Sequence, residues 1–258
     1  YEGLEVAMSK DGRYFAIGTK GNGVVTLFEN NHAVNGTATV TQKWQMPCTG
    51  QVRKIVFSDD GQHLYAGSGD MFLRKFKISD GTLVWKAYTG GWPFINGLKF
   101  STDSAYIYTG TKSFDITKVN VLTGEVTWSA FTGNLDVYNS SNGRYVMDFS
   151  GQLINNSTGT IVGKIQPSSQ KAFAYLDDFV ISGDRGIDIY HPFGSLHATR
   201  STYMDDGSGE QSQYNWVDST GTKIVVLARD MVSNGPPKNG IGCWRITPTI
   251  NRYPTLDS

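Results

Sequence analysis

Apolar and polar residues alternate over short stretches of the chain, and the alternation returns at regular intervals. The clearest copies are residues 6–18, 55–67 and 98–110. Each copy reads as an apolar stretch, a turn of the Ser-x-Asp-Gly type, a second alternating stretch and a glycine. A period of two residues is typical of β-strands, and Ser, Asp and Gly are the residues that tight turns favour. Each copy therefore predicts a β-hairpin.

A second hairpin pattern follows the first one in several copies. Residues 77–85, 120–128 and 155–162 each carry a glycine between two apolar stretches. Two hairpins make four strands in each unit. Weaker copies of the first hairpin occupy residues 137–149 and 216–227, and a degenerate copy runs from 172 to 183.

The repeat spacing indicates the architecture. The units begin near residues 4, 52, 95, 135, 172 and 214. A spacing of roughly 40 residues with four strands is typical of a propeller blade. The sequence thus predicts an all-β fold, a single β-propeller domain over residues 1–258 with about six four-stranded blades.

The hairpins also resemble those of known families. The first hairpins resemble WD40-like and YVTN-type propeller repeats, and the turns at 80–85 and 123–128, which end on Trp85 and Trp128, are similar to quinoprotein-like repeats. The resemblance implies the propeller architecture over nearly the whole chain. It implies no function, because one fold serves many functions. The Trp-Asp and Gly-His dipeptides of true WD40 repeats are absent, and the quinone-dependent dehydrogenases are typically larger, eight-bladed and metal-dependent.

Completion of the last blade is the weak point of the prediction. Residues 247–258 form either a C-terminal tail or the last outer strand, and they contain Pro248 and Pro254, which suit an edge strand or no strand. Cys48 and Cys243 fall in the first and last blades, near the same end of the sheets. We expect a disulfide between them, which would contribute roughly 4–5 kcal/mol by loop-entropy models. The alternative is two buried thiols.

Charge excludes several partner classes. The 258 residues include 23 basic and 23 acidic side chains, so the net charge is zero. Nucleic-acid and anionic-membrane partners usually require a basic excess. No stretch approaches 18 consecutive apolar residues, so membrane insertion is not expected.

No recognisable catalytic constellation occurs in the sequence. The four histidines, at positions 32, 63, 191 and 197, show no metal-binding spacing, and no nucleophile elbow is present. We therefore expect no catalytic residues, no cofactor and no metal site, and we expect that the protein is not an enzyme. A calcium site at Asp205, Asp206 and Glu210 is the open alternative, because three carboxylates with flanking glycines can hold that ion.

Loops at one end of the predicted sheets form a candidate binding face. The longest loop spans residues 229–240 and is stiffened by two adjacent prolines, and long loops on a rigid scaffold tend to bind ligands. The candidate residues of this face are Trp92, Asp184, Arg185, Arg229, Asp230, Pro236 and Pro237.

Glycosylation sequons fall at the opposite end of the predicted sheets. The acceptors are Asn35, Asn139, Asn155 and Asn156. With the expected disulfide and the low charge, they favour a secreted, extracellular or cell-surface protein whose other face remains available for contacts.

Three classes of function follow from these features. The favoured class is a non-catalytic extracellular propeller that acts through protein–protein contacts as a structural or assembly unit. Its partners would be proteins, including copies of itself if residues 251–258 add a strand to the next subunit. The second class binds carbohydrate or another ligand through the loops around Trp92. An enzyme that uses the central channel is the least favoured class.

Overall fold

The computed structural model describes the backbone of residues 3–32, 38–90, 94–111, 115–132, 137–139, 143–148 and 151–164, and of the strands between residues 174 and 245. Side chains are described only within these ranges and only as far as residue 163. All regular elements of the described residues are β-strands.

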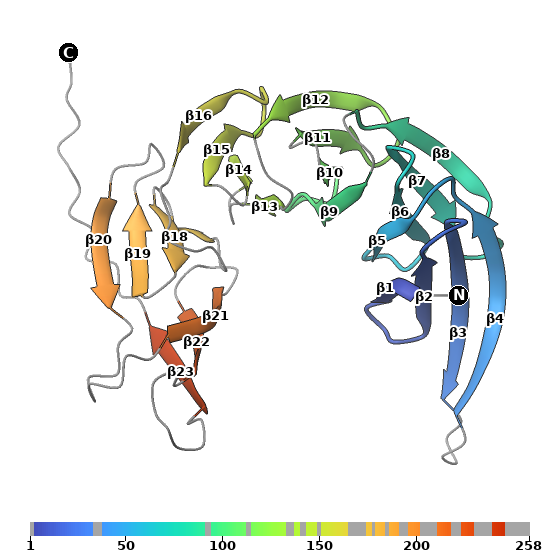
Figure 1. Cartoon of the computed structure of the whole chain (residues 1–258), viewed down its shortest axis with the longest axis horizontal. Coiled ribbons are helices and arrows are strands. Elements are labelled where there is room, and N and C mark those ends of the chain that lie inside the picture. Colours follow the sequence, from blue (N-terminus) through green and yellow to red (C-terminus); the bar gives the residue numbers. More distant parts are fainter. Residues whose placement is uncertain are drawn as a thin grey trace. The chain divides into compact units, whose positions relative to one another are not determined.

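These strands form six antiparallel sheets, and in each sheet the strands lie in chain order (Figure 1). We number the sheets as blades 1 to 6. Blade 1 comprises β1 (Gly3–Met8), β2 (Tyr14–Thr19), β3 (Val24–His32) and β4 (Ala38–Pro47). Blade 2 comprises β5 (Val52–Phe57), β6 (His63–Ser68), β7 (Phe72–Lys77) and β8 (Leu83–Tyr88). Blade 3 comprises β9 (Ile95–Phe100), β10 (Tyr106–Thr111), β11 (Asp115–Asn120) and β12 (Val126–Phe131).

The later blades have shorter or fewer described strands. Blade 4 comprises β13 (Val137–Asn139), β14 (Tyr145–Asp148), β15 (Gln152–Asn155) and β16 (Ile161–Lys164). Blade 5 comprises β17 (Ala174–Leu176), β18 (Phe179–Gly183), β19 (Gly186–Tyr190) and β20 (Leu196–Ser201). Blade 6 comprises β21 (Gln211–Val217), β22 (Lys223–Arg229) and β23 (Asn239–Arg245).

The sheets confirm the predicted all-β fold of about six blades. Blade 6 differs from the others, since three of its strands lie among the described residues and residues 247–258 lie outside them. The chain divides into two compact units, residues 1–165 with blades 1 to 4 and residues 166–258 with blades 5 and 6. That the whole chain is one domain stays an expectation.

The first hairpin of blades 1 to 3 is closed by the same hydrogen bonds. A serine hydroxyl donates to an aspartate Oδ1 two residues later, at 2.5–2.6 Å, and accepts the backbone N–H five residues later, at 2.9 Å. The pairs are Ser9 with Asp11, Ser58 with Asp60, and Ser101 with Asp103. The serine and aspartate of the repeat therefore close the turn of the first hairpin. This role explains why both residues recur at the same position in blades 1 to 3.

A tryptophan on the outer strand joins each of blades 1 to 3 to the following blade. Its indole Nε1 donates to a backbone carbonyl just after the third strand of that next blade. The pairs are Trp44 with Ile78, Trp85 with Val121, and Trp128 with Asn156, at 2.9, 3.1 and 2.9 Å.

The turn that receives each indole requires glycine. Gly81, Gly124 and Gly159 have φ of 75°, 76° and 74°, in the left-handed region that glycine tolerates best. A Cβ added to any of them would lie only 2.7–2.9 Å from the docked indole. The glycine of the second hairpin thus serves both the turn and the packing between blades.

Buried lysines reinforce two of these junctions. Lys75 Nζ donates to Val121 O at 3.0 Å, and Lys118 Nζ donates to Asn156 O at 2.9 Å. Burial lowers the pKa of both lysines. Each of these carbonyls therefore accepts an ammonium and an indole N–H together.

Two equivalent tyrosines differ in their hydrogen bonding. Tyr65 lies opposite Lys75 and Tyr108 opposite Lys118 in their sheets. The Tyr108 hydroxyl donates to Asn156 Oδ1 at 2.6 Å. The buried Tyr65 hydroxyl has no partner among the described residues. The position that Asn156 occupies in blade 4 is occupied by Val121 in blade 3, and a valine side chain cannot accept a hydrogen bond.

We expect opposite effects on stability when the two hydroxyls are removed. Tyr65→Phe should raise the free energy of unfolding by about 1 kcal/mol, because it removes an unsatisfied buried group. Tyr108→Phe should lower it by about 1 kcal/mol, because it breaks a bond. Urea denaturation measures both. In a Val121→Asn background, which supplies the missing acceptor, Tyr65→Phe should become destabilising. Equal losses in the two single variants would contradict this account.

Candidate functional site

The candidate site lies at the end of blade 2 that carries the β6–β7 turn and the connection from β8 to β9. Gly69 of the turn packs closely there, since an added Cβ would lie 3.1 Å from both Gln51 N and the Phe94 ring. Met71 and Phe94 have φ of 69° and 100°, which non-glycine residues adopt rarely and at an energetic cost. Such strain collects at functional sites and persists only where surrounding contacts enforce it.

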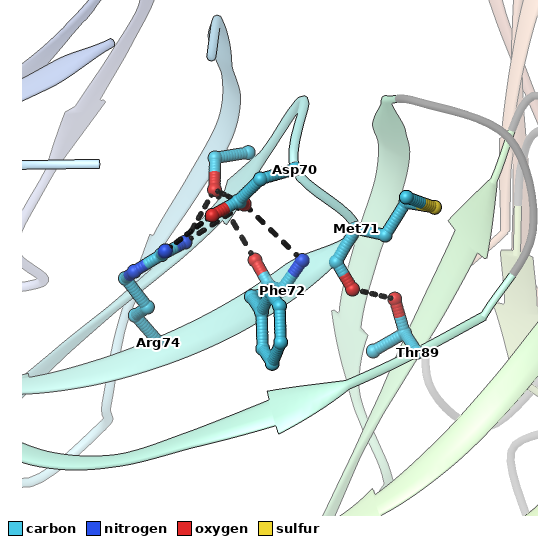
Figure 2. Close-up of polar contacts among 6 residues, drawn as sticks. Asp70, Met71, Phe72, Arg74 and Thr89 are labelled. Carbon is cyan, nitrogen blue, oxygen red and sulfur yellow. Dashed lines mark hydrogen bonds and ion pairs between the residues drawn. The ribbon is translucent and has the colours of Figure 1, made fainter. Parts of the chain in front are cut away.

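Met71 is held in its strained conformation from two sides (Figure 2). On one side, its carbonyl oxygen accepts the backbone N–H and the hydroxyl of Thr89, at 2.9 and 3.0 Å. On the other side, Arg74 forms a two-pronged ion pair with the preceding residue, Asp70, with Nη1 2.9 Å from Oδ1. Ser68 Oγ bonds to both partners, accepting from Arg74 Nη1 at 2.6 Å and donating to Asp70 Oδ1 at 2.5 Å.

The ion pair is nearly buried, with side chains 10% exposed for Arg74 and 15% for Asp70. Burial by itself raises the pKa of Asp70, but the bonds from Arg74 and Ser68 outweigh it, so the pKa lies below its usual value. Asp70 is therefore a structural carboxylate that is ionised at neutral pH.

Arg53 adds a half-buried positive charge to this end of the sheets. Its Nε and Nη2 donate to Gln51 Oε1, at 3.1 and 2.9 Å, and its Nη1 lies 3.4 Å from Asn96 Oδ1. The guanidinium also stacks over Phe94, 4.0 Å from the ring centroid. Contacts from Gln51 just before β5, from Asn96 of β9 and from Phe94 just before β9 thus fix its orientation.

Most of the binding face expected from the sequence is not covered by the described residues. Trp92, Asp184, Arg185, Asp230, Pro236 and Pro237 lie outside the described residues, as do Asp205, Asp206 and Glu210 of the calcium alternative. Arg229 ends β22, where its backbone pairs with Gln211 and Asn239. Ligand binding by these residues stays a prediction.

Sequence reasoning did not single out Arg53, Met71 or Phe94. The available signals were a bulky residue after Gly69-Asp70 in a tight turn and an arginine at the second position of an inner strand.

The sequons differ in the state of their amide groups. Asn35 lies outside the described residues. The Nδ2 groups of Asn139 and Asn156, where a glycan would be attached, donate to Phe100 O and Gly143 O respectively. Asn155 uses its Oδ1 to close its own turn, and its Nδ2 makes no bond to described residues. Glycosylation stays a prediction, with Asn155 the most available described acceptor.

Cys48 occupies a position that is threonine in the next two blades. It follows β4 directly, as Thr89 follows β8 and Thr132 follows β12, and all three are buried. It is a free thiol in the structure, and burial raises its pKa to about 11. The side chain of Cys243 lies outside the described residues, so the disulfide stays a prediction.

We expect a Cys48→Thr variant to separate the two roles of this cysteine. Under reducing conditions it should keep the wild-type free energy of unfolding within about 1 kcal/mol, because threonine stands at the equivalent positions of blades 2 and 3. Under oxidising conditions, the variant should be less stable than the wild type by about 4 kcal/mol if the disulfide forms. Equal stability under oxidising conditions would contradict the disulfide.

The remaining features at the other end of the sheets offer little chemistry. A shallow cavity of about 210 Å³ lies between the first hairpin turns of blades 1 and 2 and is lined by Lys10, Asp11, Asp59, Asp60 and Gly61. Within the described ranges, no group of three or more His, Cys, Asp or Glu residues could hold a metal ion. The same residues include no helix long and apolar enough to cross a membrane.

Comparison with solved structures supports the fold. A chain of "Crystal Structure of Mitotic Checkpoint Complex" matches with a TM-score of 0.60 and 15% identity, covering 95% of this chain and 74% of that chain. In all, 1493 chains of solved structures match, so the fold is widespread and does not by itself select a function. No curated protein sequence matches the chain.

Comparison with protein families is more specific. The model of the family described as "Outer membrane protein assembly factor BamB" matches residues 6–183. The match covers nearly all of blades 1 to 4 and the first two of the four described strands of blade 5, well over half of the chain. The chain therefore belongs to the BamB-type family of β-propeller repeat proteins.

Proposed function

We propose that this protein is a non-catalytic propeller that acts through protein–protein contacts as a structural or assembly unit. The contact surface that we assign is the end of blades 2 and 3 formed by Arg53, Met71, Tyr88 and Phe94, which we call the contact face. One observation carries the proposal. Two residues with a strained backbone, Met71 and Phe94, lie on this face in contact with Thr89 and Arg53 respectively, which favours a function in recognition over one in folding alone.

The composition of the contact face suits a protein partner. Tyr88 is 54% exposed, its hydroxyl lies 3.8 Å from Met71 Sδ, and its ring packs against Phe72. Tyrosine, methionine and arginine are enriched in the cores of protein interfaces. The family description names an assembly factor, and the solved neighbour belongs to a complex of proteins.

The finer parts of the proposal concern location and self-association. We place the protein outside the cell or at its surface, on the strength of the sequons and the expected disulfide. Self-assembly would use residues 251–258 to extend a neighbouring sheet. Deleting these residues should then abolish any oligomer seen by light scattering, and unchanged assembly would count against self-association.

Site-specific photo-crosslinking tests the contact face. A benzophenone amino acid replaces Tyr88 in one variant and Leu122 in the control. Leu122 is 79% exposed and lies in the β11–β12 turn at the other end of the sheets. In native extracts, we expect defined protein adducts from position 88 and none from position 122. If position 88 gives no adduct, or both positions give the same adducts, the contact face is wrongly assigned.

A further inference from the structure

Arg53 is arranged as a binding group rather than as a packing group. Its guanidinium lies over the Phe94 ring and donates to the amide oxygens of Gln51 and Asn96. These bonds use Nε and one N–H on each terminal nitrogen, which leaves a second N–H on both Nη1 and Nη2 without a partner among the described residues. All N–H groups of a guanidinium lie in one plane, an arrangement that can bind both oxygens of a carboxylate.

The charge of Arg53 is also uncompensated. Its neighbours are paired, Lys54 with Glu5 at 3.4 Å and Arg74 with Asp70. In the part of the chain that the structure describes, no carboxylate lies within ion-pair distance of Arg53. Its acceptors are neutral amides, so the site keeps one net positive charge.

The backbone conformation of Phe94 in this arrangement destabilises the fold. Its φ of 100° strains the backbone, and in this conformation its ring lies under the guanidinium and against Gly69. An arginine needed only to cover surface would require neither the strain nor the amide clamps. We propose that Arg53 binds an aspartate or glutamate side chain of a protein partner at the contact face. The inference rests on the proposed function and names the chemistry that the partner must present.

A single carboxylate matches this site better than a phosphate group. The site offers one guanidinium, and the nearest lysine, Lys54, is already paired with Glu5. A phosphate near pH 7 carries close to two negative charges and usually meets several cations. An unphosphorylated acidic segment is therefore the expected occupant.

Binding of synthetic peptides tests the inference. The probes are one fluorescein-labelled peptide of alternating serine and glutamate, the same peptide with glutamine in place of glutamate, and a version with phosphoserine as its only anion. Fluorescence anisotropy should show the glutamate peptide binding best, with an affinity that falls as salt rises. Arg53→Gln should lower the affinity for the glutamate peptide about tenfold. Arg53→Lys should lower it less, because lysine keeps the charge but loses the paired donors.

Arg13→Gln is the matched control. Arg13 also lies over an aromatic ring, that of Tyr14, but it is already paired with Glu29 at 2.8 Å. Its replacement should leave peptide binding unchanged. Thermal melting shows whether Arg53→Gln is folded, and Arg53→Lys remains the test if it is not.

Several results would overturn the assignment to Arg53. They are no binding of the glutamate peptide, equal binding of the glutamine peptide, preference for the phosphoserine peptide, or unchanged affinity in the Arg53 variants. Crosslinking from position 88 separates this failure from that of the proposed function. Adducts that persist in Arg53→Gln, without any carboxylate preference, would leave the contact face in place and remove only the role of Arg53.

Discussion

Replacing Trp128 by alanine is expected to lower the free energy of unfolding by about 3–5 kcal/mol, the range for large aromatic residues removed from a core. Trp128 is 9% exposed and packs against Tyr108 of its own blade and Gly159 of the next blade. Its loss would leave a cavity between blades 3 and 4 and would remove a donor from Asn156 O. Both effects weaken the same junction.

A Trp128→Phe variant separates packing from hydrogen bonding. It keeps most of the ring but loses the indole N–H, while Lys118 still donates to Asn156 O. Trp128→Phe should therefore lower the free energy of unfolding by about 1 kcal/mol relative to the wild type. Urea denaturation followed by circular dichroism, a probe of the whole sheet, measures both variants. Equal stability of wild type and Trp128→Ala would show that the indole does not join the blades.

Asp70→Asn is expected to lower the free energy of unfolding by about 3 kcal/mol, because it leaves the nearly buried Arg74 without its counter-charge. Replacing both partners together, as in Asp70→Asn with Arg74→Met, should recover most of the loss, since no unpaired charge then remains. Both single variants and the pair are measured by thermal and urea denaturation. A double variant as unstable as the sum of the single variants would contradict this coupling.

The ion pair also predicts a dependence of stability on acid. The pKa of Asp70 is lower in the folded protein than its reference value of 3.8, so its contribution is complete above that value. The contribution is lost as the pH falls through the lower folded pKa. Between neutral pH and about pH 5, the difference in unfolding free energy between wild type and Asp70→Asn should stay constant, and it should shrink in stronger acid. A difference that shrinks already near neutral pH would point to another group.

The sequence predicts the strands well because their pattern is local. The alternation in β2 and β6, and turn residues such as Ser58 and Asp60, act within a few positions of one another. The contact between Trp44 and Gly81 could be expected only as packing between blades. The indole bond to Ile78 O depends on the relative placement of two sheets, which no local pattern contains.

The candidate site was predicted less well, for a similar reason. Arg53, Phe94 and Asn96 come from two strands and a connection, and their geometry arises only when blades 2 and 3 pack together. The strained conformation of Met71 likewise depends on Thr89, 18 residues further along the chain, as well as on the nearby Asp70 and Arg74. Catalytic and metal-binding motifs in a sequence are recognised by residues such as histidine, whereas the assembled site uses arginine, amides and aromatic rings.

The docking of each tryptophan has a consequence for folding during synthesis on the ribosome. The acceptor carbonyls lie 34, 36 and 28 residues after Trp44, Trp85 and Trp128. A newly made blade therefore exposes an unsatisfied indole until the second hairpin of the next blade has emerged. Blades 1 to 4 should therefore fold in order from the N-terminus, each stabilised by the blade that follows it. A chain that stalls before Asn156 has emerged would expose its most recent tryptophan to chaperones.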